Sequence, residues 1–367
     1  MCAKVHKQKL KPSPKRVLPL AVAPTRPKPR RVVHRISFAE EDGIGKRAQQ
    51  NRLTALEERS VSCEVREQYQ GFYTKFKNFY QAAGLKWPLG KECDRVLADF
   101  LDVLFLEGRS ASEGEKVVAA VEFHHAEVKG TLVRSKRALR GWRKERPAKS
   151  RLPLPALAAF GMAMDLVARG KRTMGVKLLV DFDMYLRPGE SIAIRGRDLS
   201  APVPGGGPQF QSFSLIIRDQ EDQIADKTGT FDNTVLFNTP SREFLGQMLW
   251  GLRQRLNSPA DYLYNFTTAE FRSEFQRSGE KLGLPGLHPY QLRHGGASDD
   301  LSTRTRDHQA MKARGRWQTD QSVRRYAKTG KVQQLLNRMP SAALKYCQWS
   351  QTNMEKVLRG AMPPRAL

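Results

Sequence analysis

The sequence predicts a mainly α-helical protein with a small antiparallel β-sheet, divided into two domains. Apolar residues recur at helical spacing through most of the chain. Three short runs rich in β-branched and aromatic residues, with turns between them, fall between 191 and 238. A length of 367 residues suits two domains, since one domain typically takes about 150 residues.

The N-terminal segment, residues 1–48, is expected to be a disordered basic tail. Its first 35 residues carry 11 lysines and arginines and no acidic residue, and they mix these cations with proline. Such a tail suits an arm that touches DNA or a nuclear-import signal. A purely solubilising tail has the same composition, so the sequence leaves these roles open.

Residues 49–145 are predicted to form a helical domain. Helices are expected at 65–80, 91–107 and 112–128. Ser112 is the expected N-cap of the third helix. Aromatic residues between Tyr69 and Tyr80 form one stripe on the first helix, which favours a core face over a platform for stacking bases.

The stretch from 137 to 151 is strongly basic and leads into a proline-rich segment. It is typical of an interdomain linker, either an ordinary solvated one or a strap along a DNA backbone. We place the linker itself at 146–154. A C-terminal tail at 341–367 carries an apolar stripe that suits either docking on a neighbouring copy or packing as a terminal helix.

The second domain, residues 155–340, is expected to combine helices with the three β-rich runs, which are 191–199, 213–219 and 233–238. Helices are predicted at 155–169, 171–186, 241–256, 267–282, 290–301, 306–313 and 320–338. The Pro-Gly-Gly-Gly run at 204–207 is predicted to be a flexible loop. It is not a phosphate cradle, because no strand leads into it and no Gly-Lys-Ser/Thr follows.

The charge balance points to a nucleic-acid partner, since the formal net charge is +26 and the residues after 35 still carry +15. The cysteines form no Cys-x-x-Cys pair, which argues against disulfides or a zinc site. His124 and His125 are adjacent, so we expect two partly exposed helix histidines and no metal site. No membrane span or secretory leader is expected, and no cofactor, metal or small-molecule substrate.

Breaking a phosphodiester without a metal requires cations for the phosphate oxygens, an activated nucleophile and a proton for the leaving 5′-oxygen. Arginines fork onto phosphate oxygens and stay charged, and an indole N–H adds a further donor. A lysine beside the leaving oxygen can act as general acid. A tyrosine can attack once nearby cations favour its phenolate, because its free pKa is about 10.

The chain supplies these groups in a fixed order, beginning with Arg187. This arginine follows a predicted helix and has Glu190 three residues later. Lys227 follows in a predicted turn between two strands, where it could reach into a groove. It is the only lysine between 178 and 280, so it has no rival in the β-rich stretch.

The remaining groups fall within 37 residues. Tyr290 and Arg293 share one face of a predicted helix at i, i+3 spacing, and His294 follows directly. Trp317 stands in a Gly-Arg-Trp element nine residues before Tyr326. Tyr326 lies among arginines that would favour its phenolate, which makes it a better candidate nucleophile than Tyr290.

This order of motifs resembles the tyrosine recombinase family, the phage-integrase and Cre-like enzymes. The resemblance covers 155–340 by motif and extends over 49–145 by architecture. It implies a two-domain DNA clamp, in which a helical, SAM-like core-binding domain precedes a mixed α/β catalytic domain. The family's His-x-x-Arg motif corresponds to residues 290–293, and Tyr290 takes the place of its histidine. This is a departure from the family, because a phenol cannot become a cation near neutral pH. Trp317 replaces the commoner histidine, as in the Cre-like branch.

The resemblance also implies the role of each group. Arg187 and Arg293 would hold the scissile phosphate, Trp317 would add a hydrogen bond, and Lys227 would protonate the leaving oxygen. Tyr326 would attack and form a 3′-phosphotyrosyl bond.

The resemblance also implies supporting roles for three further residues. Tyr290 would donate one hydrogen bond to the phosphate. Glu190 would orient an arginine, and His294 would buttress the site.

The implied function is site-specific recombination or integration of double-stranded DNA by a homotetramer through a Holliday junction, as in mobile elements. Two alternatives stay open: a decayed recombinase that only binds DNA, and a type IB topoisomerase. The expected location is with DNA, in the nucleus of a eukaryote or otherwise in the cytoplasm or nucleoid.

Overall fold

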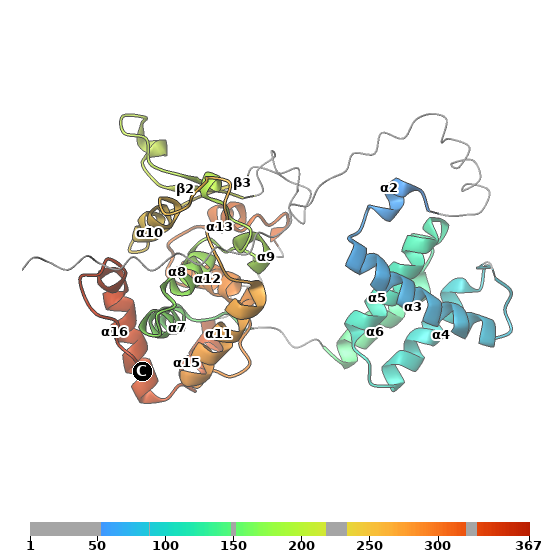
Figure 1. Ribbon diagram of the computed structural model, residues 1–367. Helices are drawn as coiled ribbons and strands as arrows, with labels where there is room; N and C mark the ends of the chain where they lie inside the picture. Colours follow the sequence, from blue (N-terminus) through green and yellow to red (C-terminus); the bar gives the residue numbers. More distant parts are fainter. Residues whose placement is uncertain (1–52, 88, 148–151, 218–232, 321–328) are drawn as a thin grey trace, which may run out of the picture. The chain divides into compact units, whose positions relative to one another are not determined.

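The computed structural model describes residues 53–87, 89–147, 152–217, 233–320 and 329–367. They form two compact units that divide between 147 and 152 (Figure 1). Within these ranges no helix is both long enough and apolar enough to cross a membrane. The tail predicted at 1–48 lies outside the described residues.

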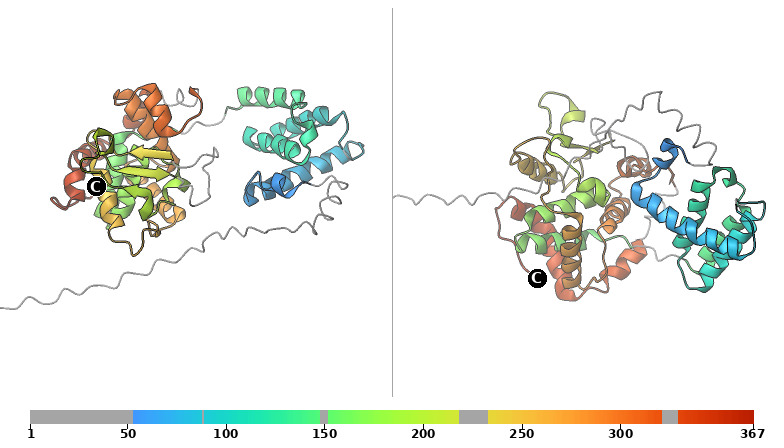
Figure 2. Two further views of the ribbon diagram at one scale, coloured as in Figure 1. Left: turned by 90° about the horizontal axis from the view of Figure 1, so that it is seen from above. Right: turned by 45° about the vertical axis from the view of Figure 1, so that its right-hand side comes forward.

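The first unit is a bundle of helices (Figure 2). They are α2 (Ala55–Glu58), α3 (Cys63–Ala82), α4 (Cys93–Leu106), α5 (Ala111–His124) and α6 (Val133–Glu145), with a 3-10 turn at Ala126–Val128. One apolar core joins α3, α4, α5 and α6, and it contains Phe76, Tyr80, Leu97 and Trp142. The burial of Phe76 and Tyr80 confirms that the aromatic stripe of α3 is a core face.

Three predictions for this unit are wrong. Helix α5 is capped by Ser110, whose Oγ accepts a hydrogen bond from the backbone of Glu113 at 3.3 Å, and not by Ser112. Residues 137–145 belong to α6 and not to a linker, because the buried side chain of Trp142 anchors this helix in the core. His125 is buried rather than partly exposed, and its Nε2 lies 2.7 Å from the hydroxyl of Tyr73.

The second unit is mainly helical and carries one small antiparallel sheet, as predicted. Its helices are α7 (Ala156–Ala168), α8 (Arg172–Asp183), α9 (Pro188–Ser191), α10 (Phe244–Arg253), α11 (Thr268–Lys281), α12 (Tyr290–Ser302), α13 (His308–Gly315), α15 (Thr329–Leu336) and α16 (Ser341–Leu358). The helix predicted at 320–338 is described only in part, since 321–328 lie outside the described residues.

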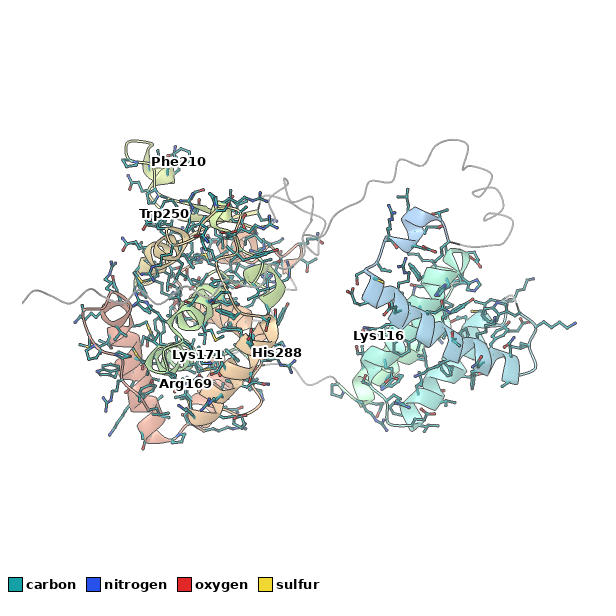
Figure 3. All side chains as sticks on the ribbon, in the orientation of Figure 1. Lys116, Arg169, Lys171, Phe210, Trp250 and His288 are labelled. Carbon is teal, nitrogen blue, oxygen red and sulfur yellow. The ribbon has the colours of Figure 1, made fainter. Side chains whose placement is uncertain are left out.

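The sheet has the strand order β1 (Leu199–Ser200), β2 (Ser214–Ile217) and β3 (Asn233–Leu236), all antiparallel. Leu199, Leu215 and Val235 lie opposite one another across the three strands, and all three are buried. The loop between β1 and β2 carries Phe210, which is 52% exposed (Figure 3).

The first predicted β-run, 191–199, is largely wrong. Ser191 ends the short helix α9, and Gly196–Asp198 form a 3-10 turn, so that only the last residue of the run belongs to a strand. The other two runs contain β2 and β3, as predicted.

Helix α7 is the centre of the second unit, since every side chain from Ala158 to Leu166 is buried. Helices α8, α11, α12 and α16 pack against it. Helix α16 approaches closely at Gly161, where an added Cβ would lie 2.4 Å from Sγ of Cys347. The apolar stripe of the C-terminal tail is thus packed as a terminal helix in its own chain, one of the two arrangements that the sequence left open.

Two glycines bring α12 close to α8 and to the segment just before α7. A Cβ at Gly295 would lie 2.2 Å from the carbonyl oxygen of Leu154, and a Cβ at Gly296 would lie 1.9 Å from that of Phe182. These residues are the two glycines that follow His294 in the sequence. Their absent side chains allow the helix that carries Tyr290 and Arg293 to lie against the helix that leads to Arg187.

Candidate active site

Arg187 is placed by the end of α8. This helix stops at Asp183, the chain reverses through Tyr185 at φ 49°, and Arg187 becomes the N-cap of α9, whose first residue is Pro188. Its backbone N–H donates to Oε2 of Glu190 at 3.1 Å, and its guanidinium pairs with Oε1 of the same carboxylate. The side chain of Arg187 keeps 19% exposure, so it can still meet a ligand from solvent.

Glu190 is shared by two arginines. Its second oxygen lies 2.5 Å from Nη2 of Arg316, and both side chains are 5% exposed. Burial alone would raise the pKa of Glu190, but the charges of Arg316 and Arg187 outweigh burial and lower it. The carboxylate therefore stays ionised at neutral pH and holds Arg187 in one orientation.

Arg293 lies on α12 and is almost fully buried, at 1% exposure. Its two terminal nitrogens donate to the carbonyl oxygens of Tyr185 and Gly315, which lie on either side of it in sequence by 108 and 22 residues. The guanidinium carbon lies 4.9 Å from the centre of the Trp317 ring. Three segments distant in sequence therefore meet at this one guanidinium.

Trp317 follows directly on the turn that ends α13. Arg316 takes the left-handed conformation at φ 53°, and the backbone N–H of Trp317 donates to Lys312 at 3.1 Å. Gly315 is required here, because a Cβ would lie 2.1 Å from the indole ring. The indole stacks on the ring of Tyr185, with centroids 6.0 Å apart and planes at 23°.

Tyr290 begins α12 and lies one helical turn before His294. Their rings meet edge to face, with centroids 5.0 Å apart. The backbone N–H of Tyr290 donates to Nδ1 of His288 at 3.1 Å, so His288 (Figure 3) contacts the start of the helix. Tyr290 and Arg293 lie on one side of α12, because they are three residues apart.

A buried charge network adjoins the end of α8, where Asp183 is one of its members. It consists of three acids and three arginines, Asp183, Asp299, Asp300, Arg242, Arg306 and Arg314. Arg242 contacts all three acids at 2.8 to 3.0 Å, and their charges raise its pKa although its burial opposes this. The opposite charges balance, which removes much of the cost of burying them.

Tyr185 connects this network to the predicted site. Its hydroxyl donates to Oδ2 of Asp300, and its side chain is fully buried. Burial, together with the charge of Asp300, raises the pKa of Tyr185, which keeps the hydroxyl protonated as a donor. This tyrosine is therefore unsuited to be a nucleophile.

Of the predicted site residues, the structure pairs Arg187 with Glu190 and Arg293 with Trp317. Tyr185, two residues before Arg187, contacts both Arg293 and Trp317, and Arg316, directly before Trp317, pairs with Glu190. Tyr290 and His294 form a further pair on α12. Lys227 and Tyr326 lie outside the described residues.

The sequence predictions missed Arg316, Tyr185 and the charge network. Arg316 stands inside the Gly-Arg-Trp element and Tyr185 two residues before Arg187, so both lay within motifs already recognised. Nothing in the sequence marks the members of the network as buried.

The arrangement suits a singly or doubly charged oxyanion. Arginines positioned by a carboxylate and by main-chain carbonyls need little reorganisation to bind such a ligand. In the ranges that the structure covers, no group of three or more His, Cys, Asp or Glu is placed to hold a metal ion.

A scan against known protein families gives no match to this chain, and a search of curated proteins gives none. Among solved structures, the chain is similar to a lambda integrase dimer bound to a COC′ core site, with a TM-score of 0.50 and 13% identity over 78% of this chain and 94% of that one. It is also similar to the XerH site-specific recombinase bound to difH substrate in a pre-cleavage complex, with a TM-score of 0.47 and 17% identity over 79% and 81%. The likeness to lambda integrase shows a shared fold.

Proposed function

From the tyrosine recombinase and integrase fold of this chain, we propose that it cuts and rejoins double-stranded DNA through a covalent bond between Tyr326 and a 3′-phosphate. The observation that carries the proposal is the meeting of three distant segments at Arg293. They bring the segment of Arg187, the helix of Arg293 and the segment of Trp317 to one place, which supports a site that offers cations and a neutral donor to a phosphate.

Arg187 and Arg293 hold the scissile phosphate in this proposal. Their positive charges stabilise the negative charge that grows on the non-bridging oxygens during attack. Glu190, itself held by the buried Arg316, keeps Arg187 oriented. The indole N–H of Trp317 adds a neutral donor, and Tyr290 adds a phenolic one.

The reaction conserves the energy of the phosphodiester bond. The phenolate oxygen of Tyr326 attacks phosphorus, the bond to the 5′-oxygen breaks, and Lys227 gives that oxygen a proton. A 5′-hydroxyl from a second strand then attacks the phosphotyrosyl bond, and the tyrosine recovers its proton. Lys227 is suited to this part because its segment joins β2 to β3, both of which are anchored in the sheet of the second unit.

The DNA-binding part of the proposal is supported by the charge of the first unit as well. Arg137, Arg140 and Lys144 are exposed and recur along one side of α6, whose opposite side is buried through Leu139 and Trp142. Such a row of cations is suited to phosphate contacts, which supply most sequence-independent affinity for DNA. In this proposal four copies assemble on two sites, and the protein is located with DNA.

Supercoiled plasmid and nicked suicide substrates provide the test. Wild-type protein should form a covalent protein–DNA adduct, and Tyr326→Phe should bind the same DNA but form none. Relaxation of any plasmid, without a preferred site, would instead favour a type IB topoisomerase.

Absence of an adduct on every DNA tested, despite tight binding, would contradict the proposal. That outcome would favour the decayed DNA-binding protein, which the unusual Tyr290 already suggests. Circular dichroism of both proteins provides the control for folding.

A further inference from the structure

Tyr185 has a backbone conformation that tyrosine rarely adopts. Its φ of 49° lies in the left-handed region, just after the C-cap of α8. The backbone N–H of the next residue, Leu186, donates to Asp181 at 3.1 Å, which is the bond that closes a Schellman turn. Glycine is the usual residue at this position, because a Cβ strains the left-handed conformation.

A glycine at 185 would provide the same turn and the same carbonyl oxygen without strain. What tyrosine adds is a ring and a hydroxyl, both fully buried. The ring stacks on Trp317, and the hydroxyl donates to Asp300, which pairs with Arg242 and Arg306. A strained residue with such contacts points to a role for its side chain, since the surroundings must maintain the strain.

We propose that Tyr185 is a positioning residue of the candidate active site, whose ring fixes the indole of Trp317 while its carbonyl oxygen fixes the guanidinium of Arg293. The two groups it holds come from α12 and from the end of α13, and they also contact each other at 4.9 Å. Its hydroxyl donates to Asp300, which joins the ring to the buried charge network.

The packing around the ring leaves it little freedom. Gly296 provides space on one side, where an added Cβ would lie 2.8 Å from Cδ1 of Tyr185. Arg314 covers the ring on another, with its guanidinium carbon 5.6 Å from the centroid. A ring held in this way presents a rigid surface to Trp317, whereas a glycine would remove this surface from the indole.

The inference rests on the proposed function. Two variants separate the contribution of the Tyr185 ring from that of its hydroxyl. Tyr185→Gly removes the ring and relieves the strain, whereas Tyr185→Phe keeps the ring and loses only the hydroxyl. Ser241→Gly is the matched control, because Ser241 is exposed and also has a positive φ, of 67°.

The first measurement is single-turnover cleavage of a suicide substrate, with DNA affinity measured in parallel. We expect Tyr185→Gly to cleave at least about tenfold more slowly, since small displacements of catalytic groups have large effects on rate, with unchanged affinity. Tyr185→Phe should stay within about threefold of wild type, since it keeps the stacked ring. Wild-type cleavage by Tyr185→Gly would overturn the proposal.

The second measurement does not require activity, so it separates failure of this inference from failure of the proposed function. Urea unfolding of Tyr185→Gly, Trp317→Ala and the double variant forms a double-mutant cycle. We expect the two losses of stability to overlap, so that the double variant loses clearly less than their sum. Strictly additive losses would show that Tyr185 does not hold Trp317, whether or not wild-type protein cleaves DNA.

Discussion

The guanidinium carbon of Arg293 lies 4.9 Å from the centre of the indole ring of Trp317. A cation over an indole face is attracted by the ring, by about 1 to 2 kcal/mol where the contact is partly desolvated. Since Arg293 is 1% exposed, the contact fixes two groups that the proposed reaction uses on the same phosphate.

Arg293→Lys should abolish most cleavage while preserving DNA binding. A lysine keeps the charge but cannot donate to the carbonyls of Tyr185 and Gly315 at once in the arginine's fork geometry. We expect the single-turnover rate to fall at least about 100-fold. Arg359→Lys, an exposed change at the C-cap of α16, should have no effect, and equal rates for the two variants would contradict the assignment.

Glu190→Gln should destabilise the fold in a way that depends on pH. The variant leaves the buried Arg316 without its ion pair, which should lower the free energy of unfolding by about 3 kcal/mol at pH 7. The pKa of Glu190 is lower in the folded protein than its usual 4.5, so its contribution is present above that pH. The contribution is lost as pH falls further through the folded pKa.

Urea unfolding at pH 7 and at pH 3 to 4 checks this, with the difference between wild type and Glu190→Gln shrinking in acid. The matched control is Glu355→Gln, which breaks an exposed pair with Arg359 and should cost less than about 1 kcal/mol. Equal losses for the two variants would show that Glu190 is not a buried carboxylate partner.

Gly296→Ala should damage the packing of α12 on α8. Its new methyl group would lie 1.9 Å from the carbonyl oxygen of Phe182, a backbone atom that cannot easily move away. We expect a loss of about 3 kcal/mol in unfolding free energy. Gly251→Ala in α10 is the control, since it meets open space and should be neutral or slightly stabilising. Calorimetry measures the stability of both variants, and equal stabilities would contradict this prediction.

Tyr290→Phe should slow cleavage by about three- to tenfold if the hydroxyl donates one hydrogen bond to the phosphate. Tyr290→His should match or exceed wild type, and its advantage should grow below about pH 6.5, where imidazole gains a charge. Rates measured across pH 5.5 to 8 test both variants. An unchanged rate in Tyr290→Phe would remove Tyr290 from the phosphate site.

The exposed cations of α6 should affect the affinity for DNA and not the rate at which the bound complex cleaves it. Replacing Arg140 by Ala should reduce the salt dependence of DNA binding by about one ion per site, equally for different sequences. Lys356→Ala, on the exposed side of α16, is the control and should leave the salt slope unchanged. Filter binding from 50 to 300 mM salt measures how steeply the DNA affinity of each variant falls with salt. An identical slope for the two variants would show that Arg140 does not contact DNA.

Helical periodicity predicted most of the helices because it reflects burial directly, as in α3 and α4, whose predicted and observed bounds differ by one to two residues. The N-cap of α5 was harder, because Ser110 and Ser112 are each followed three residues later by a glutamate. Only the structure shows which hydroxyl meets a backbone N–H.

Residues of the candidate site could be selected from the sequence where the proposed chemistry needs a specific residue type, as at Arg187, Arg293 and Trp317. Its supporting residues could not, because Asp300 and Arg242 belong to residue types that are normally exposed, and their burial depends on tertiary pairing. The interpretation of 137–145 as part of a linker was wrong for a related reason. The cations of this stretch suggested an interdomain segment, whereas Trp142 anchors it as a helix.

In the proposed function Tyr326 bonds covalently to DNA, and peptide mapping of the trapped adduct locates that bond. Wild-type protein is incubated with a nicked suicide substrate, digested with nuclease and trypsin, and analysed by mass spectrometry for a peptide that carries a nucleotide. We expect one modified peptide, which begins after Arg325 and contains Tyr326, with the nucleotide attached through its 3′-phosphate. A nucleotide on Tyr290 or on any other residue, or no modified peptide at all, would contradict the proposal.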